Sequence, residues 1–218
     1  MKNLKLIISI TILSIFFNLL SFNDTKAADP PRIKEIRAEY TKWQKVIKNK
    51  LKKADVLYMY YDEELYRNDE ENDIDIESNY KKYQIWLKNQ IVDETKIEYE
   101  QFDKFRIITD DKLGTYINQF TTSLSGDWSI VTDYYYDKND KLIFIYWNAT
   151  TTYSETGLST TERRLYFDEN GKLIRRLEKT FDPRTKKKVN SFQEFNEVEY
   201  KIDLKEMDFY PHWKNTDE

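Results

Sequence analysis

The 218-residue sequence contains no cysteine and a single histidine, His212, near its C-terminal end. Without cysteine there can be no disulfide, no Cys–His catalytic pair and no lipid attached through a thiol. A Ser–His–Asp triad would have to use His212, and no Gly-x-Ser-x-Gly turn presents a suitable serine. Nucleophilic catalysis is therefore nearly excluded, and we expect His212 to be an ordinary surface residue.

Glycine and proline are scarce, with four of each, and the glycines lie too far apart to form a phosphate-binding loop. Positive charge is not in excess either, since the net charge at pH 7 is −4. Without residues 1–27, 32 basic and 38 acidic side chains remain, which gives −6. Nucleic acids and anionic membrane surfaces attract clustered Lys and Arg, so neither is an expected partner. We expect no cofactor.

The N-terminus has the three parts of a secretory signal. Two lysines precede an apolar stretch at residues 6–20, and small residues at Thr25 and Ala27 suit cleavage after Ala27. A membrane anchor would need about 20 apolar residues, and this stretch is shorter and contains four polar ones. The sequence predicts a signal peptide at 1–27, followed at 28–218 by one secreted or periplasmic domain of bacterial type with no membrane anchor.

Residues 62–77 contain nine acidic side chains and one basic one. A helix–loop–helix calcium site needs glycine at its sixth position and glutamate at its twelfth. Counted from Asp69, those positions hold Ile74 and Tyr80. We therefore expect a solvated loop and no metal site. The alternating carboxylates that suggested a cation are Asp69, Glu71, Asp73, Asp75 and Glu77.

Apolar residues recur every three or four positions from Arg32 to Ala54, which predicts one long helix. Packing against a core is favoured over a coiled coil with another chain. The stripe consists of Ile33, Ile36, Tyr40, Trp43, Ile47, Leu51 and Ala54.

The region between this helix and residue 127 predicts a mixture of elements. Val56–Tyr61 is rich in aromatic and branched residues and indicates a strand. Residues 78–91 fit either a helix or a strand, and short strands are expected at 97–99 and 105–108. The spacing at 113–120 predicts another helix.

The second half of the sequence contains a repeat, because residues 135–143 align with 166–174. Each copy has an aromatic run, an Asn-Asp or Asn-Gly pair and a second apolar run. Such pairs favour a two-residue type I′ turn. Two hairpins are therefore expected at 128–152 and 160–181, joined near Gly157 into a four-stranded meander.

The repeated motif, aromatic-aromatic-Asp-x-Asn-Gly-Lys-Leu-Ile, resembles hairpin units of secreted bacterial proteins of unknown function. More loosely, it is similar to the Tyr-Asp repeats of large secreted toxins. The resemblance covers roughly residues 128–180 and implies a hairpin, but no activity and no functional residue. Beyond it, alternation at 200–204 indicates a last strand, and the tail from Pro211 is expected to be frayed.

Aromatic side chains mark both faces of the first hairpin. Alternation places Tyr134 and Tyr136 on one face and Tyr135 on the other. In the next strand, Phe144 and Tyr146 should oppose Ile143, Ile145 and Trp147. These rings can belong to a core, or an exposed row can stack on a ligand. Tyr134, Tyr136 and Trp147 are the candidate ligand-binding residues.

The predicted fold class is α+β, with a long N-terminal helix packed on a mainly antiparallel meander that could curl into a half-barrel. Three functions stay open. The first is a non-catalytic binding module for a protein, glycan or lipid, and the second is a carrier of an apolar ligand in a curled sheet. The third is a hydrolase that uses carboxylates alone, although we do not expect an enzyme. Carboxylates available to it include Asp133, Asp137, Glu155 and Glu162.

Overall fold

The computed structural model describes residues 29–61, 84–89, 101–123, 125–192 and 194–214. From Arg32 onward the chain forms one compact unit. Its first element is helix α2 (Pro31–Lys50), which ends in the 3-10 turn η2 (Leu51–Lys53). The helix predicted from the apolar stripe is confirmed, and its residues Ile33, Ile36 and Trp43 are buried.

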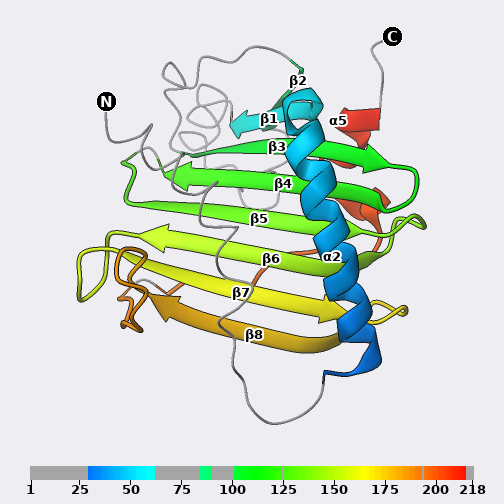
Figure 1. Cartoon of the computed structure of the whole chain (residues 1–218). Helices are drawn as coiled ribbons and strands as arrows, with labels where there is room; N and C mark the ends of the chain where they lie inside the picture. Colours follow the sequence, from blue (N-terminus) through cyan, green and yellow to red (C-terminus); the bar gives the residue numbers. More distant parts are fainter. Residues whose placement is uncertain (1–28, 62–83, 90–100, 124, 193, 215–218) are drawn as a thin grey trace, which may run out of the picture. The chain divides into compact units, whose positions relative to one another are not determined.

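Eight strands form one antiparallel sheet in the order β2-β1-β3-β4-β5-β6-β7-β8 (Figure 1). Strands β2 and β8 are its two edges, so the sheet is open and does not close into a barrel. The predicted fold class, a helix with a mainly antiparallel sheet, is confirmed. The strands are β1 (Asp55–Tyr61), β2 (Gln84–Lys88), β3 (Gln101–Asp110), β4 (Gly114–Ser123), β5 (Trp128–Tyr136), β6 (Leu142–Thr151), β7 (Ser159–Phe167) and β8 (Leu173–Phe181).

Most predicted strands are confirmed, including the four-stranded meander β5–β8. The ambiguous segment at 78–91 contributes a strand at Gln84–Lys88, whereas the expected strand at 97–99 lies outside the described residues. The helix predicted at 113–120 is wrong, because this stretch forms β4. Both faces of β4 are covered: Ile117 belongs to one apolar cluster and Tyr116 to the other. Apolar residues on both faces remove the alternation by which a strand is recognised.

The two repeated turns have the same structure, and it differs from the predicted type I′ turn. In the first, the Asp140 amide donates to the Asp137 carbonyl at 3.0 Å, and the Asp137 amide donates to the Lys141 carbonyl at 2.8 Å. The Asp137 carboxylate accepts from two further amides of the turn. This pattern is a type I turn closed by one residue with positive φ, which is Asp140 here and Gly171 in the second turn.

A bulge follows each turn and changes which face a side chain occupies. Tyr135 pairs with Phe144 and Tyr136 pairs with Leu142, so Ile143 is the extra residue. Ile143 therefore lies in the cluster under α2 with Phe144. The expectation that it shares a face with Ile145 is wrong, because that expectation assumed unbroken alternation.

The C-terminal segment (residues 194–214) covers the face of the sheet that α2 does not cover. It contains the 3-10 turn η4 (Leu204–Glu206) and the short helix α5 (Tyr210–Lys214). The last strand expected at 200–204 is absent, since the described residues there form only the isolated bridge between Lys141 and Asp203. The tail is not frayed up to Lys214, because Trp213 is buried and its Nε1 donates to Asp55 at 3.0 Å. Among the described residues, no helix is long and apolar enough to span a membrane.

Candidate functional site

The three residues predicted to bind a ligand lie together on the sheet face that carries the C-terminal segment. Tyr134, Tyr136 and Trp147 belong to the same apolar cluster and are only 4%, 0% and 4% exposed. The tyrosine hydroxyls donate to main-chain carbonyls of the C-terminal segment. Tyr134 reaches Glu199 at 3.2 Å, and Tyr136 reaches Lys201 at 3.0 Å. This aromatic surface is therefore occupied by the protein's own chain.

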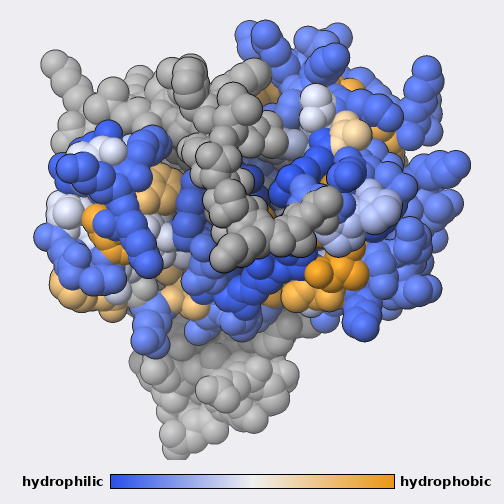
Figure 2. Space-filling view, turned by 60° about the horizontal axis from the view of Figure 1, so that its bottom comes forward, coloured by the Kyte–Doolittle hydropathy of each residue, from blue (hydrophilic) through white to orange (hydrophobic). Residues whose placement is uncertain are grey.

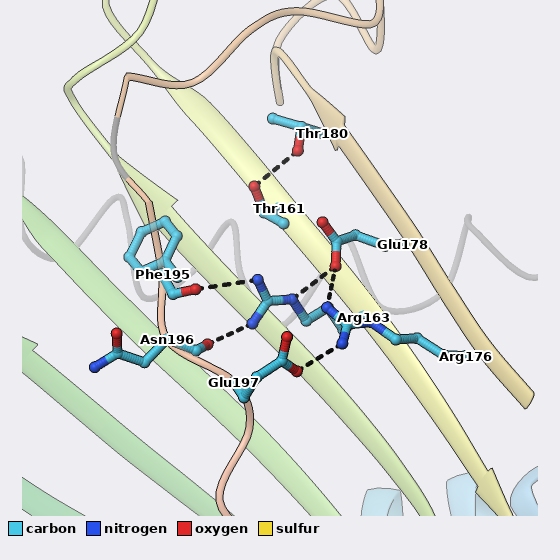
Figure 3. A network of polar contacts seen from close by, with 8 residues as sticks. All are labelled: Thr161, Arg163, Arg176, Glu178, Thr180, Phe195, Asn196 and Glu197. Carbon is cyan, nitrogen blue, oxygen red and sulfur yellow. Dashed lines mark hydrogen bonds and ion pairs between the residues drawn. The ribbon is translucent and has the colours of Figure 1, made fainter. Parts of the chain in front are cut away.

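A buried arginine fixes the start of the same segment (Figure 3). The Arg163 guanidinium lies 4.5 Å from the centre of the Trp147 ring and donates to the carbonyls of Phe195 and Asn196. Its Nε donates to Glu178 at 2.9 Å. The Phe195 ring in turn meets Trp147 edge to face, with centres 5.6 Å apart. The aromatic face and Arg163 together hold the segment in place.

The opposite face carries a row of polar side chains, which we call the polar ladder. Its members are directly opposite one another on five successive strands, β3 to β7. Each lies two positions along its strand from a residue of the cluster that packs against α2, so the ladder runs alongside the helix. The polar ladder consists of Arg106, Asn118, Asp133, Tyr146 and Arg164.

Asp133, at the centre of the ladder, is a buried carboxyl group held by two neutral donors. Its Oδ1 accepts from the Tyr116 hydroxyl at 2.8 Å and from the Asn118 amide at 2.8 Å. Burial raises the pKa of Asp133 to about 6, and the two hydrogen bonds oppose that rise only in part. Near neutral pH this carboxyl therefore changes its charge with small changes in its surroundings.

A second buried carboxylate, Glu162, adjoins the ladder. It accepts a hydrogen bond from the Tyr146 hydroxyl at 2.9 Å, and Lys179 Nζ lies 2.9 Å from its other oxygen. The Arg164 guanidinium is 3.9 Å from Glu162 and 5.8 Å from the centre of the Tyr146 ring. Burial, and then the nearby Glu162 charge, raise the pKa of Tyr146 well above its ordinary value. Tyr146 therefore stays a neutral hydroxyl donor.

Asp133 and Glu162 were two of the four carboxylates considered for a hydrolase, and the structure gives each a set of internal donors. The other two form hydrogen bonds within loops. Asp137 accepts hydrogen bonds from amides of its own turn, and Glu155 accepts one from the Asn190 side chain at 2.9 Å. None of the four is paired with a second carboxylate across a described pocket.

A shallow pocket of about 320 Å³ lies between β2 and the C-terminal segment. The His212 ring stacks on Trp86 with centres 4.6 Å apart, and it is exposed, as predicted for a surface residue. Burial lowers the pKa of His212, while the charge of Asp208 acts in the opposite direction. The pocket is lined by Gln84, Trp86, Lys205, Glu206, Met207, Asp208, Pro211 and His212.

Within the described part of the chain, no three His, Asp or Glu residues are placed to hold a metal ion. The acidic segment at 62–77 lies outside the described residues, so the expectation of a solvated loop stays a prediction.

Sequence reasoning missed the polar ladder as a unit, although it named Asp133 and the adjoining Glu162 as available carboxylates. A signal was present, because Asp133 and Arg164 each lie two positions before the first tyrosine of a repeat copy, Tyr135 and Tyr166. Aligning these positions across five strands requires the register, and the bulges make the register uncertain from sequence.

Comparison with known protein families, characterised proteins and solved structures finds no match for this chain.

Proposed function

We propose that the protein is a non-catalytic binding module that works outside the cytoplasm, and that the polar ladder beside α2 binds its ligand. The observation that carries this proposal is the continuous row of polar side chains across five strands. A sheet face next to a packed helix normally carries apolar residues, because buried polar groups weaken folding unless they are fully paired. The row is therefore the strongest candidate for a recognition surface on this face.

The chemistry of the ladder fits a glycan. An aromatic ring at Tyr146 can stack against the apolar face of a sugar ring. The neighbouring Asn118 supplies an amide and Arg164 a guanidinium, while the buried Asp133 and Glu162 accept hydrogen bonds from within the protein and hold the ladder in position. Hydroxyl-rich ligands need both kinds of partner at fixed spacing, and a sheet provides that spacing.

The two alternatives have less support. A carrier needs an apolar cavity, yet α2 and the C-terminal segment each fill an apolar cluster on their own face of the described sheet. The half-barrel that would enclose a ligand thus stays an expectation without support. A hydrolase needs two carboxylates that face a common substrate, and Asp133 and Glu162 are instead held by internal donors.

Binding of the purified protein to an array of soluble bacterial oligosaccharides tests the proposal. We expect at least one glycan to bind, and Arg164→Gln to weaken that binding by about tenfold, the loss of one charge-assisted hydrogen bond. Arg176→Gln is the matched control, because Arg176 pairs with Glu197 of the C-terminal segment on the opposite face. Absence of any glycan binding, or equal losses in both variants, would contradict the proposal.

A further inference from the structure

Two loops at one end of the sheet are joined into a single projecting unit, which we call the loop tip (residues 152–158 and 182–192). Ser154 and Ser191 form an antiparallel bridge, and the Phe192 amide donates to the Tyr153 carbonyl at 3.0 Å. Tyr153 and Phe192 are therefore direct cross-strand neighbours, whose side chains lie on the same side of this pairing.

These two aromatic side chains are the most exposed of the large hydrophobic residues in the described chain. Phe192 is 69% exposed and Tyr153 is 51% exposed. Leu173, Ile174 and Tyr200 are less exposed, at 38%, 37% and 36%, and the face in Figure 2 is mainly hydrophilic with small separate hydrophobic areas. The two neighbouring exposed rings are the candidate contact surface of the loop tip.

The loop tip also holds the most basic short stretch of the described chain. Residues 184–188 contain one arginine and three lysines and no acidic residue. Arg184 is engaged by Asp182 and by the Thr156 carbonyl, and Lys186 lies 5.2 Å from the centre of the Phe181 ring. Lys187 and Lys188 are exposed.

Hydrogen bonds within and between the two loops hold the main chain of the loop tip in place. Asp182 accepts hydrogen bonds from the amides of Arg184 and Thr185, and its carbonyl accepts from the Lys186 amide at 2.8 Å. The Asn190 side chain donates to Glu155 of the other loop at 2.9 Å. Little conformational freedom is left to lose on docking, which favours binding.

We propose that the loop tip docks on the surface of an anionic lipid bilayer. Phe192 and Tyr153 would enter the boundary between headgroups and acyl chains, and Lys187 and Lys188 would pair with lipid phosphates. The negative net charge of the whole chain argued against such a surface. That argument concerned the average charge, whereas docking depends on the charge within about 10 Å of the membrane. The proposal does not depend on the polar ladder or its ligand.

Flotation with large unilamellar vesicles tests the proposal. The protein is used without residues 1–27, because the compact unit begins at Arg32 and the apolar N-terminal segment could itself bind lipid. We expect it to float with vesicles of equal parts phosphatidylglycerol and phosphatidylcholine at low salt, and not with phosphatidylcholine alone. High salt should release it.

Two double variants assign the binding to the loop tip. Lys187→Glu with Lys188→Glu, and Phe192→Ser with Tyr153→Ser, should each reduce the bound fraction about tenfold or more. The control is Lys52→Glu with Lys53→Glu, which makes the same charge change on the exposed η2 turn and should retain binding. The proposal is overturned if neither variant of the loop tip binds less than the control. It is also overturned if the wild type does not float with anionic vesicles, which is the result expected if the loop tip contacts a protein instead.

Discussion

At Gly171 the backbone takes a conformation that only glycine adopts without strain, since φ is +78°. A Cβ at this position would also lie 2.4 Å from a methyl carbon of Ile202 in the C-terminal segment. The equivalent residue of the first hairpin, Asp140, has a φ of +61° and a side chain that is only loosely paired, 3.8 Å from Lys205.

Opposite outcomes are therefore expected at the two turns. Gly171→Val should lower the free energy of unfolding by roughly 2–5 kcal/mol, through backbone strain and overpacking against Ile202. Asp140→Gly should be neutral or stabilising, by up to about 1 kcal/mol, because it relieves strain at the equivalent position. Urea melts with equal m-values measure both changes. Wild-type stability of Gly171→Val would refute the turn assignment.

Asp133 links the polar ladder to a pH-dependent stability. The pKa of Asp133 is about 6 in the folded protein, whereas the ordinary value of an aspartate, which applies to the unfolded chain, is 3.8. The folded state therefore holds the proton more tightly than the unfolded state. The protonated form therefore stabilises the fold fully below about pH 4, and this contribution is lost as the pH rises through 6.

We expect Asp133→Asn to be more stable than the wild type by about 3 kcal/mol at pH 8, because asparagine cannot ionise. The difference should vanish near pH 3.5. Urea melts of both proteins between pH 3.5 and pH 8 measure it. A variant that is less stable than the wild type at pH 8 would contradict a raised pKa of Asp133.

The C-terminal segment is the element whose position depends most on side chains far away in the sequence. Trp147, Tyr134 and Tyr136 contact it from the central strands. Arg163 reaches it from β7 and accounts for two hydrogen bonds to its main chain. Because these bonds go to carbonyl groups, they depend little on which side chains the segment carries.

Arg163→Ala should lower the free energy of unfolding by roughly 2–4 kcal/mol, since it removes charge-assisted hydrogen bonds and contact with Trp147. Amides near residues 195–204 should also exchange faster with solvent. Arg176→Ala, in the same network but more exposed, is the control and should have a much smaller effect. Equal effects of the two substitutions would mean that Arg163 does not anchor the segment.

For the whole molecule, the prediction with the widest consequences concerns export. We expect secreted protein to begin at Ala28, because Thr25 and Ala27 meet the small-residue requirement for cleavage. N-terminal sequencing of protein from the culture medium or periplasm measures this. An intact Met1 on protein recovered from the source cell would contradict the export prediction and the compartment that the proposed function assumes.

Elements with local signals were predicted well from the sequence. The spacing of three or four residues between apolar side chains from Ile33 to Leu51 predicted α2. The repeated Asn-Asp and Asn-Gly pairs predicted the two hairpins. Positive φ at Gly171 followed from the same local chemistry. Each of these depends on residues that are close together along the chain, so no knowledge of the tertiary structure was needed.

Features that depend on distant residues were decided only by the tertiary structure. β4 was mistaken for a helix because both of its faces are buried, and the tail was expected to fray because the contact of Trp213 with Asp55 lies outside any local pattern. The candidate residues Tyr134, Tyr136 and Trp147 shared a face as alternation requires, but only the course of the C-terminal segment determined that this face is covered. The polar ladder likewise exists only through the register of five strands, because cross-strand neighbours meet through main-chain pairing that no single strand specifies.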